Sequence, residues 1–264
     1  MTAIEDPIRG SVSGAASGAT PDSAIWVAVD QGARRYHADA TAYRRARYRM
    51  AVAVADGVGD SLDAAWAGQV AADTAARAGL AGGALEALAE ARDVVLSVDP
   101  AAAGDSALVV AVGECRTGWD VAWVGDCRAW TWRDGLLVQV TTDHTVAERM
   151  RELGERPLPH MEHVLTSSLR SRLVPDGSVH VPPGPLLLTT DGVHKSLDRA
   201  EIEAALRDAG ARVGAGSGVG AGSGVGSDFD REGEVGDLAE ALVAAARRAG
   251  SRDNAAAVLV RATR

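Results

Sequence analysis

Four apolar runs along the chain end or begin at an aspartate. Three of them lead into an aspartate beside glycine, and the fourth follows an aspartate that stands before asparagine. The runs are Ala51 to Ala55 before Asp56-Gly57, Val121 to Val124 before Gly125-Asp126, Leu186 to Leu188 before Asp191-Gly192, and Ala255 to Val260 after Asp253-Asn254. Short apolar runs bounded by glycine are typical of buried strands. In an antiparallel sheet the end of one strand lies beside the start of its neighbour. The pattern therefore predicts that the four carboxylates converge at one sheet edge.

A carboxylate cluster of this kind needs compensating charge. Carboxylates held close together repel one another, and bound cations relieve that repulsion. Oxygen-only ligands favour hard ions such as Mg²⁺ or Mn²⁺ over zinc. Each aspartate beside glycine is, on its own, more typical of a turn in which the side chain bonds its own backbone. The fourfold recurrence on strongly apolar runs favours a metal site.

The remaining pattern predicts strands and two pairs of helices. An alanine-rich segment, 60–80, carries Trp66 and Val70 at i, i+4 spacing, which is typical of a helix packed on a sheet. A second helix is expected antiparallel to it. The other expected elements are strands at 107–112, 119–124 and 128–132, a helix at 198–209 and a helix at 235–249.

The chain is predicted to form a single domain with two irregular segments. Residues 1–20 are mostly small and polar and are interpreted as a flexible lead-in, with one domain over 21–264. A short flap is expected at about 147–168, where substrate selectivity would lie. The repeat of glycine, serine, alanine and valine at 213–227 is interpreted as a linker insertion.

Composition narrows the choice of partners and compartment. A formal net charge of −9 argues against a nucleic-acid partner, whose phosphates need a basic surface. Cys115 and Cys127 are too few for a disulfide framework and are interpreted as buried thiols in a reducing compartment. The first residues do not form a signal peptide, and no run approaches the ~18 apolar residues of a membrane span. A cytoplasmic location without membrane attachment is expected by elimination.

Taken in order, the aspartate motifs resemble those of a known family. In residue type, order and spacing they are similar to the motifs of the metal-dependent protein serine/threonine phosphatases, the protein phosphatase 2C (PPM) family, bacterial type: Asp56-Gly57-Val58-Gly59, Gly125-Asp126-Cys127-Arg128, Asp191-Gly192-Val193 and Asp253-Asn254. The resemblance extends from about Asp22 to Val260. It implies an α/β (α+β) sandwich of two central, mainly antiparallel β-sheets, flanked by helices on both outer faces.

The resemblance also assigns a metal site. It implies two ions, Mn²⁺ or Mg²⁺, with Asp56 bridging them, the Gly57 carbonyl on one ion, and Asp191 and Asp253 on the other. Asp56, Asp191 and Asp253 are thus the expected catalytic residues. In bacterial relatives a third ion is found, and here Asp126 would hold it together with Asp191.

Other residues are assigned with alternatives. Asp22 matches a family aspartate that supports the metals, usually through water, but the family's phosphate-binding arginine has no counterpart near it, since Arg9 is too distant. Lys195, the only lysine, would either bind a phosphate oxygen or face solvent. His144 would either act on substrate or serve in capping and packing. Val58 occupies the place of a histidine that is the proposed general acid in some relatives.

The function that the resemblance implies is hydrolysis of phosphoserine or phosphothreonine in proteins by a metal-activated water. A phosphorylated protein would be the substrate, and a cellular serine/threonine kinase system the counterpart. Two alternatives stay open. One is a catalytically weak binding or regulatory module on the phosphatase fold. The missing arginine favours it, as do Asp105, which stands where the family usually has serine or threonine, and Lys195, which lies where small or acidic residues are common. The four aspartates oppose it. The other is a hydrolase of small phosphoesters.

Overall fold

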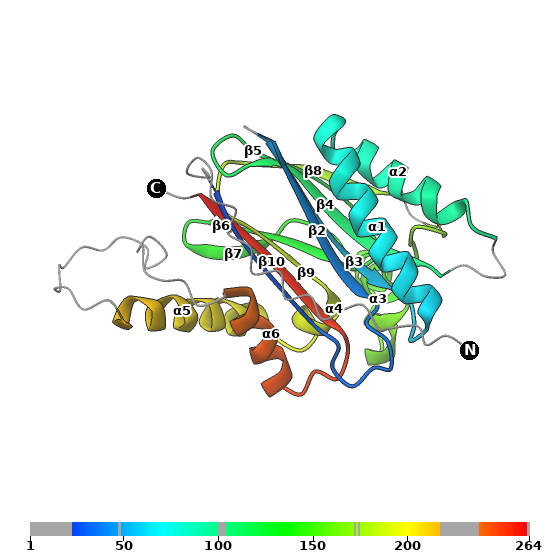
Figure 1. Cartoon of the computed structure of the whole chain (residues 1–264). Helices are drawn as coiled ribbons and strands as arrows, with labels where there is room; N and C mark the ends of the chain where they lie inside the picture. The colour runs from blue at the N-terminus through cyan, green and yellow to red at the C-terminus, as the bar shows by residue number, and fades with distance from the viewer. Residues whose placement is uncertain are drawn as a thin grey trace, which may run out of the picture.

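Two five-stranded sheets form the centre of a computed structural model of the chain (Figure 1). The structure describes residues 23–46, 49–99, 104–171, 173, 175–216 and 238–262. One sheet has the order β1 (Ser23–Asp30), β10 (Ala255–Ala262), β9 (Leu186–Thr189), β6 (Arg128–Arg133) and β7 (Leu136–Gln139). The other has the order β2 (Asp39–Ala46), β3 (Arg49–Gly57), β4 (Ser106–Glu114), β5 (Gly118–Val124) and β8 (Gly177–Val181). All the described strand pairs are antiparallel.

Helices cover both outer faces of the sandwich (Figure 1). On the sheet that contains β3 lie α1 (Leu62–Ala81) and α2 (Ala84–Leu96). On the sheet that contains β10 lie α5 (Arg199–Gly216) and α6 (Leu238–Arg248). Three short helices occupy connections between strands: α3 (Val146–Glu152), the 3₁₀ helix η2 (Pro159–His163) and α4 (Asp191–His194). The predicted fold class is confirmed.

The apolar runs are continuous because both faces of the central strands are buried. In β10, Val258 packs between the two sheets, whereas Leu259 packs under α5 and α6. In β3, Val54 faces the inter-sheet core and Ala53 faces α1 and α2. Successive residues of a strand point to opposite faces, so a strand with two covered faces has no need of polar positions.

The packing face of α1 differs from the predicted one. Trp66 is 41% exposed and Val70 is only partly buried. The face against the sheet consists of small residues, among them Ala64, Ala67, Gly68, Ala71, Ala75 and Gly79. A methyl group added at Gly79 would lie 2.9 Å from Cβ of Ala51 in β3, so the helix approaches the strand closely. The helix itself is confirmed, and the expectation that Trp66 helps pack it on the sheet is wrong.

The irregular segments agree only in part with expectation. The lead-in, 1–20, lies outside the described residues, as do residues 217–227 of the expected linker. Residues 213–216, placed in that linker, belong to the end of α5. The flap, 147–168, contains most of α3 and all of η2. None of the helices in the described part of the chain is long and apolar enough to cross a membrane.

The strand ends of the two sheets meet at one end of the sandwich. Gly57, at the end of β3, pairs with Ser106 at the start of β4. In the other sheet, Thr189 at the end of β9 pairs with Ala257, close to the start of β10. The residues that follow β3 and β9 and those that precede β10 are thereby brought to the same region.

The inter-sheet core predicts a large effect for one substitution. Leu188 of β9 is fully buried between the sheets, so Leu188→Ala should lower the free energy of unfolding by roughly 2–5 kcal/mol. Leu85→Ala, at a position of α2 that is 51% exposed, is the matched control and should change it by less than about 0.5 kcal/mol. Urea unfolding followed by circular dichroism measures both. Equal losses in the two variants would contradict this assignment of the core.

Candidate metal centre

The four aspartates of the sequence motifs line one cavity. Asp56, Asp126, Asp191 and Asp253 all border a space of about 140 Å³ at the end of the sandwich where the strands meet. Their side chains come from both sheets: the end of β3, the turn between β5 and β6, the start of α4 and the turn before β10. The convergence that the strand pattern predicts is therefore present in the fold.

Glycines beside the aspartates permit this close approach. Gly125 adopts φ = +89°, a conformation that strains other residues, and it turns the chain so that Asp126 follows β5 into the cavity. Gly192 lies against the turn before β10, where an added Cβ would meet the carbonyl oxygen of Asn254 at 1.8 Å. A side chain at Gly192 would thus push α4, and Asp191 with it, away from Asp253.

A fifth carboxylate, which the sequence interpretation missed, lies behind the cavity. Asp39 pairs with Asp56 across β2 and β3, is 5% exposed and accepts a 2.6 Å hydrogen bond from the Thr190 hydroxyl. Burial raises its pKa well above the usual value, and the charge of Asp191 adds to this. Asp39 is thus a buried carboxylate directly beside a motif aspartate.

Asp22 itself lies outside the described residues. The sequence signal that could have identified Asp39 is an aspartate at the start of a strand, since Asp39 is the first residue of β2. Asp39 is placed by its pairing with Asp56, whereas the supporting role expected for Asp22 stays a prediction.

The centre of the site has an excess of buried negative charge. Burial raises the pKa of Asp56 well above its usual value, and the charges of Asp39 and Asp191 raise it further. Burial likewise raises the pKa of Asp126 to about 6, with Asp191 adding to the rise and Lys195 opposing it. Such shifts mark carboxylates that are desolvated and close to like charges.

Two cationic side chains and a histidine contact the aspartates of the site. Arg34, from the β1–β2 connection, donates two hydrogen bonds of 2.7 and 2.6 Å to the Asp253 carboxylate. Nζ of Lys195 lies 2.5 Å from Asp126 and 3.0 Å from Asp191. Nδ1 of His163, at the end of η2, lies 3.8 Å from Asp191. The expected flap thus contributes a residue to the site.

The pKa of Asp191, unlike that of Asp56 and Asp126, is lowered. Burial alone would raise this pKa, but the contact with His163 and the charge of Lys195 lower it below the usual range. Lys195 has a side chain that is 13% exposed. The alternative in which this lysine faces solvent is therefore wrong, and the position expected for a third ion, between Asp126 and Asp191, holds its ammonium group.

His144 is buried and serves the backbone. It does not line the aspartate cavity; its Nδ1 accepts a 3.3 Å hydrogen bond from the Gly125 N–H, and its own N–H donates to the Gly125 carbonyl at 2.9 Å. Burial lowers its pKa. The packing alternative therefore describes His144, and the cap of α3 is the neighbouring Thr145, whose hydroxyl accepts from the Glu148 N–H.

Asp105 joins the base of the flap to the sheet. Its carboxylate accepts hydrogen bonds from the Ser168 hydroxyl at 2.5 Å and from the Arg170 N–H at 3.0 Å. Its carbonyl accepts from the N–H of Val58, two residues beyond Asp56. This residue, which departs from the family pattern, thus fixes the chain on either side of the cavity.

The donor set fits a hard cation. In the part of the chain that the structure describes, no three His, Cys, Asp or Glu side chains already stand together as ligands of one ion. Five of the residues that line the cavity nevertheless carry side-chain oxygen donors, namely Asp56, Asp126, Asp191, Asp253 and Asn254, and Asp56 has no cationic partner among the described contacts. Oxygen donors with uncompensated charge are the ligands that Mg²⁺ and Mn²⁺ prefer.

Comparison of the sequence with protein-family models and with curated proteins gives no match. Among solved structures, the PPM Ser-Thr phosphatase MsPP from Mycobacterium smegmatis, in complex with cacodylate, is 25% identical over 91% of this chain and 98% of its own, with a TM-score of 0.66. The S. agalactiae serine/threonine phosphatase is 16% identical over 91% and 100%, with a TM-score of 0.72. This chain has the PPM phosphatase fold.

A further structure with the PPM fold contains metal. The catalytic domain of the phosphatase PstP, in complex with two manganese ions, is 19% identical over 92% of this chain and 99% of its own, with a TM-score of 0.62. The likeness to these bacterial phosphatases covers nearly the whole chain, so the resemblance seen in the aspartate motifs is confirmed for the fold.

The raised pKa values predict how the metal-free protein responds to pH. Between about pH 4, where free aspartates titrate, and the raised pKa values of the folded state, the folded protein binds more protons than the unfolded one. Asp39 and Asp56 are shifted upward and Asp126 reaches about 6, so this stability is present at low pH and lost as pH rises. With EDTA, the contribution of these carboxylates to the melting temperature should fall from pH 5 to pH 7.5, whereas His37, His144 and His194, whose pKa values burial lowers, change it in the opposite direction.

Scanning calorimetry of three proteins tests this. Asp126→Asn should show a smaller fall than the unchanged protein, and Asp93→Asn, an exposed position of α2, should show the same fall. Added Mn²⁺ should raise the melting temperature more at pH 7.5 than at pH 5, because it replaces the protons. The same pH dependence in Asp126→Asn and in the unchanged protein would contradict the carboxylate cluster.

Proposed function

We propose that this protein is a metal-dependent phosphatase that hydrolyses phosphoserine or phosphothreonine in proteins. The observation that carries the proposal is the convergence of Asp56, Asp126, Asp191 and Asp253 on one cavity of a PPM fold. That PstP binds two manganese ions supports Mn²⁺ or Mg²⁺ as the cofactor. Asp56, the Gly57 carbonyl, Asp191 and Asp253 would hold two ions.

The lining of the cavity favours water as the nucleophile. Among the described residues that border it there is no serine, threonine or cysteine. Cys127 is fully buried, and burial raises the pKa of its thiol well above the usual value, which makes it a poor nucleophile. Bound divalent ions would supply hydroxide near neutral pH and neutralise charge on the phosphoryl oxygens.

Arg34 is the residue that we propose binds the substrate phosphate. It borders the aspartate cavity and also a wider adjoining space of about 470 Å³, together with His163, Asp191 and Asp253. Its side chain is 42% exposed, so a substrate has access to it. A planar guanidinium with paired donors suits phosphate oxygens, and Arg34 supplies the function for which the sequence interpretation found no residue.

The protein substrate rests on the resemblance and on the likeness to bacterial serine/threonine phosphatases. A cellular serine/threonine kinase system would be the counterpart. A catalytically weak regulatory module is the second candidate, because Arg34 and Lys195 already compensate Asp253, Asp126 and Asp191 in this structure. Turnover measurements separate the two candidates.

Asp56 should be required for metal-dependent turnover. Asp56→Asn should lower Mn²⁺-dependent hydrolysis of a phosphothreonine peptide and of p-nitrophenyl phosphate by about 100-fold or more, since the charge that would bridge the ions is lost. Asp73→Asn, at an exposed position of α1, is the matched control and should keep normal turnover. Near-normal turnover in Asp56→Asn would refute the metal mechanism. No turnover by the unchanged, folded protein in any metal would favour the regulatory module.

Arg34 should affect substrate affinity more than the chemical step. Arg34→Ala should raise KM for p-nitrophenyl phosphate about tenfold at saturating Mn²⁺, because a charge-assisted contact to the phosphate is lost. Inhibition by inorganic phosphate should weaken by a similar factor. The neighbouring Arg35 lies over the Tyr36 ring and does not border the cavity, so Arg35→Ala should change neither value. Equal effects of the two variants would exclude a specific role for Arg34.

A further inference from the structure

We propose that the ammonium group of Lys195 is a built-in substitute for a third metal ion, so that this protein takes up two divalent ions and no third. The inference rests on the proposed function, because it concerns the same site. It goes beyond that function in assigning a cation-replacing role to one residue and in fixing how many metal ions the protein holds.

The position of the ammonium carries the inference. Nζ of Lys195 lies between two carboxylates, 2.5 Å from Oδ2 of Asp126 and 3.0 Å from Oδ2 of Asp191. The side chains are 13%, 6% and 15% exposed for Lys195, Asp126 and Asp191. These two aspartates are the pair that the resemblance assigns to a third ion. Their facing oxygens are already bound to a cation that belongs to the chain.

The surrounding structure directs the lysine to this place. Lys195 is the C-cap residue of α4, and its backbone N–H donates to the carbonyl of Asp191, the residue one helical turn before it. Residues four apart on a helix share one face, so Nζ and the Asp191 carboxylate meet without distortion. Only Asp126 has to be brought in from another element, and the Gly125 turn does so.

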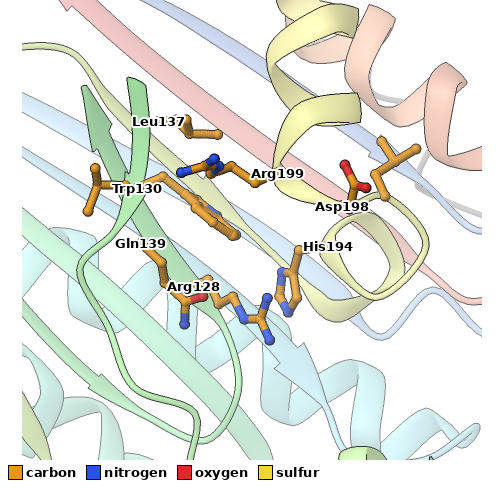
Figure 2. A pocket seen from close by; sticks show the side chains of 9 residues that line it. Arg128, Trp130, Leu137, Gln139, His194, Asp198 and Arg199 are labelled. Carbon is orange, nitrogen blue, oxygen red and sulfur yellow. The ribbon is translucent and has the colours of Figure 1, made fainter. Parts of the chain in front are cut away.

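Contacts behind α4 fix its orientation. The preceding residue, His194, is buried, and its Nδ1 lies 2.9 Å from the Thr189 hydroxyl, which also accepts a 3.0 Å hydrogen bond from Nε1 of Trp130. Figure 2 shows His194 with Trp130 and Arg128 around a separate cavity of about 360 Å³. The His194 and Trp130 ring centroids are 6.3 Å apart. With His194 held on this side, Lys195 faces the aspartates.

The choice of residue type points the same way. Among the 27 lysines and arginines of the chain, Lys195 is the only lysine. A guanidinium is planar and suited to one carboxylate face, whereas an ammonium is a compact charge with three donors that can serve two carboxylates from different elements. The one position where the chain uses lysine is therefore the one that resembles a small cation site.

The experiment counts Mn²⁺ ions bound at equilibrium, by dialysis with elemental analysis and by native mass spectrometry of the full chain. The unchanged protein should bind two. Lys195→Ala should bind three, because the pair of carboxylates is freed. The double variant Lys195→Ala/Asp126→Asn is the matched control and should return to two, because it lacks a ligand for the third ion.

Each outcome decides between the alternatives. Three ions in the unchanged protein, or two in a folded Lys195→Ala, would overturn the inference and leave the two-ion phosphatase intact. No bound Mn²⁺ in the unchanged protein would overturn the inference and the proposed function together. Should Lys195→Ala not fold, Asp126→Asn alone decides: the count stays at two if Lys195 replaces the ion and falls from three to two otherwise.

Discussion

Repulsion among buried carboxylates is the constraint on which the rest of this structure depends. Asp39, Asp56, Asp126, Asp191 and Asp253 meet at one end of the sandwich, and burial raises the pKa values of the first three. A cluster of this kind holds together only if rigid elements fix its members and other charges compensate them. The fold supplies both.

The rigid part is the backbone at the strand ends. Asn254, next to Asp253, accepts a hydrogen bond from the Ala38 N–H and donates to the carbonyls of Gln31 and Tyr36. One amide thus joins the start of β10 to the β1–β2 connection, which carries Arg34 and leads into Asp39. Gly57 allows α1 to approach the end of β3 closely, since an added Cβ at Gly57 would lie 2.1 Å from the Ala64 carbonyl oxygen.

Local pattern was sufficient for most of the buried strands, for the four longer helices and for four of the carboxylates. Asp56, Asp126, Asp191 and Asp253 stand beside apolar runs that form buried strands, so their positions follow from chain-local signals. Asp39 does not stand beside a continuous apolar run. It belongs to β2, which is an edge strand with several half-buried or exposed residues, and no glycine stands next to it. Its role depends on its pairing with Asp56, and pairing between strands is a property of the whole fold.

The same limit explains the errors at Lys195 and Trp66. From the sequence, a lysine close to an aspartate is expected to face solvent. The burial of Lys195 is favourable because the turn at Gly125 places the Asp126 carboxylate beside its ammonium group. Trp66 has the helical spacing expected of a residue that packs on the sheet. The close approach of α1 to β3, however, leaves room only for alanine and glycine on that face of the helix. In both cases the deciding quantity is a distance between elements far apart in the sequence.

The distribution of charge indicates where a divalent ion would gain most. Arg34 compensates Asp253, and Lys195 compensates Asp126 and Asp191. Asp56 has no cationic partner among the described contacts, and the buried Asp39 accepts a hydrogen bond from the neutral Thr190 hydroxyl. Because desolvated charge is most costly where no cation is near, the Asp56 carboxylate is the part of the cluster for which a hard cation has the strongest electrostatic advantage.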